Sequence, residues 1–248
     1  MLKRYLKRKV TEDGVNSLAN AVYGMMRPAP AHRLFSKSPD MVFIWVPKTA
    51  GSSVFSFLNA GLGMRKLKTF NHAMSFRNRG SVTFDHMHYL SLLRSGIVSG
   101  DFHDRAFKFS FVRDPYARVA SLYNYATRRD LLDGDGFDRF LDHVFRRPPV
   151  GMYNRAGLSQ TNPQTDWLMG EAGDLLPDRI FRVEALDEFS SYFRDTYDLT
   201  FDPSERHNAS TPVITVDDIL GNAERTEKVN ALYARDFDLL GYEKVVPQ

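Results

Sequence analysis

The sequence predicts an α/β fold in which helices flank a central parallel sheet. Three runs, over residues 41–46, 107–112 and 179–184, have the length and the aromatic or β-branched content of buried strands. Each is followed by a segment with helical spacing of its apolar residues, so strands and helices alternate along the chain. Such alternation is typical of parallel sheets with helices on both faces. Because ligands of these sheets bind beyond the carboxyl ends of the strands, the residues after each run are the candidates for a site.

The other elements follow from shorter signals. A helix is expected over 52–62, where Gly61 or Gly63 supplies the stop. Further helices are expected over 86–94, 137–145, 186–197 and part of 216–240, and a short strand over 81–85. Three polar, basic or turn-rich stretches are expected to be irregular: 66–79, 130–136 and 147–163.

Length and composition indicate one globular domain. The chain has 248 residues, of which 43% are hydrophobic and 25% charged, which suits a single α/β domain over residues 41–248. Residues 1–40 are expected to form a basic tail, a short helix and a connector. The net charge of +3 is compatible with an anionic nucleotide but does not indicate nucleic acid as a partner. Without cysteine, the chain can form neither disulfides nor thiolate metal sites.

The run P-K-T-A-G-S-S, from Pro47 to Ser53, joins the first expected strand to the first expected helix. Backbone N–H groups at a helix start point toward an anion, the helix dipole favours negative charge, and Lys48 adds a mobile cation. The arrangement is P-loop-like but is not a Walker loop, in which a glycine precedes the lysine. An ordinary strand–turn–helix junction with a surface lysine is the alternative.

A second motif begins at Arg113, where the second expected strand ends. Asp114 is a good N-cap and Pro115 suits the first helical turn, so a helix is expected to start here. Arg118 and Ser121 are three residues apart and share one face of this helix, where a guanidinium and a hydroxyl could bind a phosphate. The alternative is a solvated Arg118 on a helix that packs through its apolar residues.

Together, P-K-T-A-G-S-S and R-D-P-Y-A-R-V-A-S-L-Y resemble the two nucleotide motifs of the sulfotransferases that use 3′-phosphoadenosine 5′-phosphosulfate (PAPS). The resemblance extends from about Met41 to Tyr242, and it is greatest to carbohydrate sulfotransferases of the chondroitin and heparan type. It implies a P-loop-like sheet, PAPS as the sulfuryl donor and a carbohydrate hydroxyl as the acceptor.

The resemblance assigns the first motif to the 5′-phosphosulfate and the second, through Arg113 and Ser121, to the 3′-phosphate. Lys48 would stabilise the charge that develops on the leaving phosphate. A sulfuryl group carries less charge than a phosphoryl group, so no metal is expected to be required, and no cluster of His, Asp and Glu has metal-ligand spacing. The donor-binding residues of the first motif are expected to be Pro47, Lys48, Thr49, Ala50, Gly51, Ser52 and Ser53.

Two histidines, His86 and His88, are candidates for the base that removes the acceptor's proton. A neutral imidazole is available near neutral pH, and a positioned base typically contributes ~10²–10⁴-fold to the rate. In relatives a histidine stands in a G-H-[ML]-[ST]-like element, with which Asp85-His86-Met87 aligns, although an aspartate occupies the glycine position. His86 is therefore preferred over His88, and purely structural roles for both remain open.

Two further stretches resemble family elements. His207-Asn208-Ala209-Ser210-Thr211 is similar to the loop that closes over the nucleotide, which implies that Ser210 contacts PAPS. Asn162-Pro163-Gln164-Thr165-Asp166-Trp167 is similar to an element on the acceptor side, where Gln164 would orient a sugar or form a structural hydrogen bond. Trp167 is expected to fill the core.

The function expected from these motifs is PAPS-dependent sulfation of a carbohydrate. One alternative is a kinase, which would need a Walker loop and a carboxylate that holds Mg²⁺. Another is a non-catalytic module that binds a glycan or nucleotide and would tolerate loss of Lys48 or of the histidine.

The expected partners are a 3′-phosphoadenosine nucleotide and a glycan or glycoconjugate. No stretch of the sequence approaches the ~20 apolar residues of a membrane span. Animal members of the family are anchored in Golgi membranes. This sequence differs from them because it has no such apolar stretch. We therefore expect a soluble, cytoplasmic enzyme of bacterial type, unless the chain is a piece of a longer protein.

Overall fold

A computed structural model describes residues 38–132, 134, 136–144, 158–202 and 211–247. Its centre is a five-stranded sheet with the strand order β2-β3-β1-β4-β5, and every neighbouring pair is parallel. The strands are β1 (Met41–Ile44), β2 (Arg65–Lys66), β3 (Ser81–Thr83), β4 (Phe107–Val112) and β5 (Arg179–Arg182). The predicted α/β fold with a central parallel sheet is confirmed.

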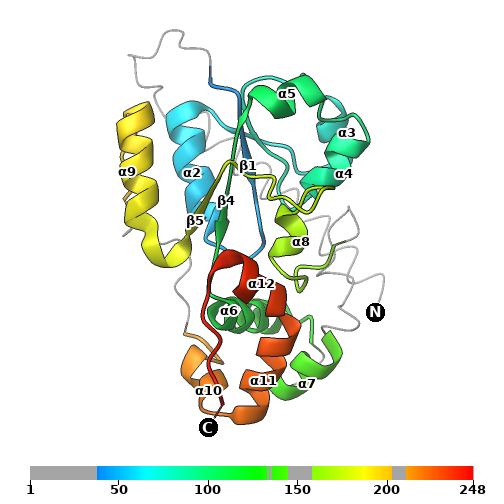
Figure 1. Cartoon of the computed structure of the whole chain (residues 1–248), viewed down its shortest axis with the longest axis vertical. Coiled ribbons are helices and arrows are strands. Elements are labelled where there is room, and N and C mark those ends of the chain that lie inside the picture. The colour runs from blue at the N-terminus through cyan, green and yellow to red at the C-terminus, as the bar shows by residue number, and fades with distance from the viewer. Residues whose placement is uncertain (1–37, 133, 135, 145–157, 203–210, 248) are drawn as a thin grey trace. The chain divides into compact units, whose positions relative to one another are not determined.

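Helices fill the connections between the strands and most of the described chain after β5 (Figure 1). Those that precede β4 are α2 (Gly51–Leu62), α3 (Phe70–Met74), α4 (Tyr89–Arg94) and α5 (Gly100–Arg105). Between β4 and β5 lie α6 (Pro115–Arg128), α7 (Phe137–Arg139), the π-helix η1 (Phe140–Val144) and α8 (Thr165–Leu168). The 3-10 helix η3 (Val183–Ala185), α9 (Leu186–Tyr197), α10 (Val216–Leu220), α11 (Ala223–Leu232) and α12 (Ala234–Leu240) follow β5.

The alternation of side chains along β1 and the residues after it determines which helices cover each face of the sheet. Phe43 and Trp45 pack on one face with residues of α2 and α9, whereas Val42 and Ile44 pack on the other with residues of α4, α5 and α8. Figure 1 shows these two groups of helices on opposite sides of the sheet. The first face is mainly aromatic, and the stacked rings of Phe43 and Phe109 have centroids 5.1 Å apart.

A third hydrophobic cluster is formed by the helices at the carboxyl end of the sheet. α6 starts directly after β4, where Asp114 accepts a hydrogen bond from the N–H of Ala117 (2.9 Å) and Pro115 occupies the first turn. One face of α6 packs through Val119 and Leu122 against side chains of α10, α11 and α12. The other face of α6 is left to border the space beyond the strand ends.

Most expected elements are present, but several have different boundaries. The expected strands over 41–46, 81–85 and 179–184 end earlier because the chain turns into loops or into η3. The expected helix over 86–94 begins only at α4, since Asp85 has a φ of 55° and its neighbours form a turn. The stretch over 216–240 contains three short helices, whereas β2, α3 and α5 were not anticipated because each has six residues or fewer.

Gly63 ends α2 with a φ of 67° and is one of the two glycines that were expected to end this helix.

Residues 1–37 lie outside the described residues, and so do 145–157 of the expected irregular stretch. Contacts group the chain from Ser38 onward into one compact unit. None of the helices in the described residues combines the length and the apolar character needed to cross a membrane.

A buried carboxylate connects α12 to the start of α8. Asp236 accepts hydrogen bonds from the backbone N–H groups of Gln164 (2.8 Å) and Thr165 (2.9 Å) and from the Thr165 hydroxyl (3.0 Å). These bonds hold the start of α8, where Gln164 contacts the backbone of Arg113 at the end of β4.

Replacing Asp236 with alanine should lower the free energy of unfolding by about 3 kcal/mol, because three buried donors lose their acceptor. A lower denaturant midpoint at an unchanged m-value would show the effect. Asp238→Ala is the matched control, since Asp238 is an exposed carboxylate on the same helix, and it should change stability by less than about 1 kcal/mol. Equal stability of the two variants would contradict the role given to Asp236.

Candidate functional site

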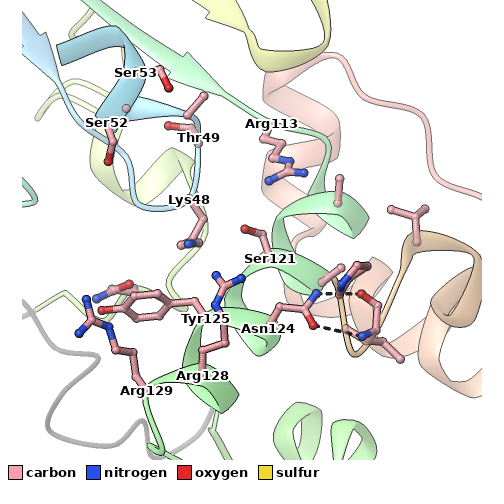
Figure 2. A pocket seen from close by; sticks show the side chains of 18 of the residues that line it. Lys48, Thr49, Ser52, Ser53, Arg113, Ser121, Asn124, Tyr125, Arg128 and Arg129 are labelled. Carbon is pink, nitrogen blue, oxygen red and sulfur yellow. Dashed lines mark hydrogen bonds between the residues drawn. The ribbon is translucent and has the colours of Figure 1, made fainter. Parts of the chain in front are cut away.

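A cavity of about 1060 Å³ lies beyond the carboxyl ends of β1 and β4. It is lined by the loop after β1, the start of α2, the end of β4, one face of α6 and the segment that leads into α10 (Figure 2). Four cationic side chains, Lys48, Arg113, Arg128 and Arg129, line it, and no Asp or Glu is among the lining residues in the described part of the chain. The cavity is therefore built to hold a ligand with several negative charges.

The loop after β1 has two residues in the left-handed region, Lys48 with φ 69° and Ala50 with φ 57°. Thr49 between them is buried, and its hydroxyl donates a hydrogen bond to the carbonyl of Val46 (2.8 Å), which fixes the loop to the strand end. Ala50 precedes α2 without a side-chain capping bond. Since Ala50 and the first residues of α2 line the cavity, the first N–H groups of this helix are available to an anion.

The start of α2 needs a glycine. A Cβ atom at Gly51 would lie 1.8 Å from Nε1 of Trp45, far inside any allowed contact. The close approach packs the helix start directly on the indole that follows β1. Any side chain at position 51 would therefore move either the loop after β1 or Trp45.

Arg113 reaches the cavity from the end of β4, and Gln164 fixes its backbone. The N–H of Arg113 donates to Oε1 of Gln164, and its carbonyl accepts from Nε2, both at 2.8 Å. Gln164 is fully buried and does not line the cavity. Of the two roles considered for Gln164, the structure shows the structural hydrogen bond, and no surface of this side chain is left for a sugar.

Ser121 lines the cavity from α6, as expected, and Figure 2 shows it between Lys48 and Arg113. Arg118 of the same helix is fully buried and does not line it. Its guanidinium donates to the carbonyls of Pro47 (3.1 Å), Asn162 (3.0 Å) and Gln160 (2.8 Å). Both interpretations of Arg118, as a phosphate ligand and as a solvated residue, are wrong, because it supports the backbone of the loop that carries Lys48.

A further residue of α6, Asn124, fixes the opposite wall of the cavity. Its Oδ1 accepts from the N–H groups of Val213 (2.7 Å) and Ile214 (3.1 Å), and its Nδ2 donates to the carbonyl of Ile214 (2.8 Å). The bonds between Asn124 and Ile214 are drawn as dashed lines in Figure 2. They hold the segment before α10 against α6, a contact that the sequence analysis did not anticipate.

Three further lining residues were not anticipated from the sequence: Tyr125 and Arg128 in the second half of α6, and Arg129 directly after it. Nζ of Lys48 lies 4.6 Å from the centre of the Tyr125 ring, and Cζ of Arg129 lies 5.8 Å from it. The helical spacing from Ser121 predicts further lining residues, because positions three, four and seven residues after it lie on the same face of the helix. Those positions are Asn124, Tyr125 and Arg128, and all of them line the cavity.

The electrostatics of the cavity are visible in Lys48. Its pKa is lowered to about 8, first by burial and then by the positive charges of Arg128, Arg113, Arg129 and Arg118. A bound anion stabilises the charged form of a lysine in such surroundings more than it stabilises the charged form of a solvated lysine. The four arginines thus make Lys48 sensitive to the charge of the ligand.

His86 lies in the cavity wall between two indoles. Its ring makes edge contacts with those of Trp45 and Trp167, at centroid distances of 5.2 and 6.4 Å. Its Nδ1 lies 3.1 Å from the carbonyl oxygen of Trp45, and since a carbonyl only accepts, the proton is on Nδ1. Burial lowers the pKa of His86, while the carboxylate of Asp85 opposes this shift. The neutral ring therefore carries its basic lone pair on Nε2.

The aspartate that departs from the family pattern, Asp85, has a φ of 55°. A glycine adopts this left-handed conformation freely and an aspartate adopts it more readily than most residues, which explains both the usual glycine and its replacement here. Oδ1 of Asp85 lies 3.6 Å from Nζ of Lys66, which in turn stacks over the Trp45 ring at 3.9 Å. Lys66 therefore balances the negative charge of the turn that carries His86.

His88 is separated from the cavity. It precedes α4, its Nδ1 lies 2.8 Å from Oγ of Ser91, and a hydrogen bond with the backbone of Asp166 opposes the lowering of its pKa by burial. It is not among the lining residues. Of the two histidines, the structure brings only His86 to Lys48 and Arg113.

Ser210, expected to contact the nucleotide, lies outside the described residues. Pro47 is fixed by Arg118 and does not line the cavity, whereas the other six residues of the first motif do. Trp167 is fully buried, as expected for a core residue.

Comparison with known proteins identifies the family of the chain. The family model described as the sulfotransferase family matches residues 31–243. No curated protein matches the chain. Among solved structures, the chain is similar to a sulfotransferase from Alicyclobacillus acidocaldarius, with 16% identity, a TM-score of 0.49, and coverage of 84% of this chain and 98% of the other. On the match of the family model, which spans most of its length, the chain belongs to the sulfotransferase family.

Proposed function

We propose that the protein transfers the sulfuryl group of PAPS to a hydroxyl of a carbohydrate acceptor. The observation that carries this proposal is the cavity with four cations, no lining carboxylate among the described residues and an uncapped helix start. A nucleotide with a 3′-phosphate and a 5′-phosphosulfate has several negative charges at two separate points. The cavity offers cations from both β1 and β4 to meet them.

The loop after β1 would bind the 5′ end of the donor through Lys48 and the first N–H groups of α2. Arg113 and the hydroxyl of Ser121 would bind the 3′-phosphate, because a guanidinium and a hydroxyl on adjacent elements can form charge-assisted bonds to its oxygens. The bound donor would supply an activated sulfuryl group. Lys48 then lies where negative charge grows on the departing phosphate, which it stabilises without a metal ion.

His86 would remove the proton of the attacking hydroxyl. Its neutral state and the lone pair on Nε2 suit a general base. Trp45 and Trp167 limit the rotation of the ring. The role of His88, by contrast, is to support the start of α4.

Tyr125, Arg128 and Arg129 would bind the acceptor. Tyr125 and Arg128 lie beyond Ser121 on α6, Arg129 follows the helix directly, and all three line the cavity. An aromatic ring suits the apolar face of a sugar, and two guanidinium groups suit a carboxylate or sulfate on it. A negatively charged saccharide fits this arrangement better than a neutral one.

The decisive experiment is transfer of labelled sulfuryl from PAPS by the full chain, in the presence of a chelator, to a panel of neutral and acidic saccharides. We expect sulfated product with an acidic member of the panel. We also expect stabilisation against heat by adenosine 3′,5′-bisphosphate without metal. Arg113→Ala should weaken binding of this nucleotide by about 10- to 100-fold through the loss of charge-assisted bonds. Arg94→Ala, on an exposed arginine of α4, is the control and should bind normally.

Other outcomes would favour the alternatives. Greater stabilisation by ATP with Mg²⁺ would favour a kinase, and saccharide binding without any transfer would favour a non-catalytic module. Normal nucleotide binding by Arg113→Ala would contradict the assignment of the 3′-phosphate.

Affinity for adenosine 3′,5′-bisphosphate should fall as the pH rises through about 8. The free protein loses the positive charge of Lys48 there, since the pKa of this lysine is lowered to about 8. The nucleotide does not change its charge in this range, because the second phosphate pKa is about 6. Calorimetric titration should show a decline of roughly tenfold between about pH 7 and about pH 9. Lys48→Arg remains charged, so an equal decline in that variant would exclude Lys48 as the titrating group.

His86→Ala should reduce kcat by ~10²-fold or more and leave nucleotide affinity nearly unchanged. His88→Ala is the matched control and should be far milder, because His88 does not line the cavity. Burial lowers the pKa of His86, so the active, neutral form should persist in acid and activity should fall only below about pH 6.5. A pH profile of kcat/KM with an acid limb above that value, or full activity of His86→Ala, would remove His86 from the mechanism.

A further inference from the structure

The segment from Arg65 to Arg79, which runs from β2 through α3, forms a surface that the proposed chemistry does not use. Two large apolar side chains of α3 are exposed on it, Phe70 at 48% and Met74 at 64%. They are four residues apart, so they lie on the same face of the helix. We call this segment, with its exposed cations, the α3 surface.

The exposure of these side chains belongs to an ordered helix. Thr69 caps α3 by accepting a hydrogen bond from the N–H of His72 (3.2 Å). Ala73 and Phe76 point inward, and the ring of Phe76 packs on that of Phe102 with centroids 5.0 Å apart. Ala73 within α3 and Phe76 just after it thus anchor the helix in the core, which leaves Phe70 and Met74 on the outside.

The charge of the α3 surface is uniformly positive. Four exposed cations, Arg65, Lys68, Arg77 and Arg79, accompany the two apolar side chains, and the sequence from 64 to 84 contains no Asp or Glu. None of the four forms an ion pair with a residue that the structure describes. Positive charge without compensation beside exposed apolar groups is unfavourable for a purely structural surface.

We propose that the α3 surface docks on a lipid bilayer that contains anionic lipids. The four cations match negatively charged head groups, and Phe70 and Met74 match the apolar region just beneath them. An acidic polysaccharide or a nucleic acid would satisfy the cations but would offer no apolar phase to the two side chains. The combination therefore selects a membrane surface.

Docking would be separate from the cavity. In Figure 1 α3 lies beside α4 and α5, at the opposite end of the view from α10 and α11. No residue from 65 to 79 lines the cavity. Substitutions on the α3 surface should therefore leave binding of adenosine 3′,5′-bisphosphate unchanged, which separates this inference from the proposed function.

The test is sedimentation of the full chain with vesicles of phosphatidylcholine, either pure or with about 30% phosphatidylglycerol. We expect binding to the anionic vesicles only, and loss of binding at about 1 M salt, where charges are screened beyond ~3 Å. Lys68→Gln with Arg77→Gln should weaken binding by about 25-fold, on the basis of roughly fivefold for each cation. Phe70→Gln with Met74→Gln should weaken it by about tenfold at unchanged net charge. Leu239→Gln, at an exposed leucine of α12, is the control and should bind normally.

A fluorescence measurement detects insertion directly. The two native tryptophans, Trp45 and Trp167, are buried, so a Phe70→Trp variant adds one exposed reporter. Its emission should shift to the blue with anionic vesicles and be quenched by brominated acyl chains. No vesicle binding, or no quenching, would overturn the proposal.

Two further outcomes would also overturn it. The glutamine variants at Phe70 and Met74 could bind the anionic vesicles as tightly as the wild type while the charge variants bind heparin more weakly, which would indicate a polysaccharide surface. Alternatively, binding could persist in both pairs of variants and disappear when the five cations of residues 1–10 are neutralised. That result would assign membrane contact to the N-terminal tail.

Discussion

The buried guanidinium of Arg118 is the interaction on which the site depends. It donates to the carbonyl of Pro47 in the first motif and to those of Gln160 and Asn162 in the segment before α8, and it lies 5.5 Å from the ring of Tyr233. Burying a cation is costly unless its donors find acceptors, and here three carbonyls from two segments accept from the guanidinium. A lysine could not replace it, because a single ammonium has neither the planar fork nor the reach to join these segments. Arg118 therefore supports the loop of Lys48 from behind and leaves the cavity side of that loop to the ligand.

The gathering of cations around an acid-free cavity has an energetic consequence. Lys48 and the arginines repel one another, and the pKa of Lys48 is lowered first by burial and then by this repulsion. Tyr125 moderates it, because its ring offers electron density to both Lys48 and Arg129. A polyanionic ligand would remove the repulsion altogether. Relief of this repulsion would contribute to affinity, and it would favour a highly charged ligand over a singly charged one.

Sequence reasoning succeeded where the signal is local. The alternation of strands and helices predicted the parallel sheet, and the position of each motif after a strand predicted that Lys48 and Arg113 would lie at one edge of it. It failed for Arg118, because its burial depends on a segment more than 40 residues away. Arg128 and Arg129, at and just after the end of α6, were overlooked, although the spacing of Arg128 from Ser121 places these two side chains on one face of the helix. The aspartate at position 85 could be interpreted only once its positive φ was known.

The two amide side chains that hold the walls of the cavity illustrate why long-range contacts escape such reasoning. Gln164 accepts from the N–H and donates to the carbonyl of Arg113, and Asn124 does the same for Ile214. Each amide thus forms the pair of bonds that a neighbouring strand would form, at a point where the sheet has ended. A carboxylate of the same shape could accept but not donate, and it would bring a negative charge beside the cationic side chains of the cavity. The amides therefore join the walls of the cavity while preserving its positive potential, a requirement that no local sequence pattern expresses.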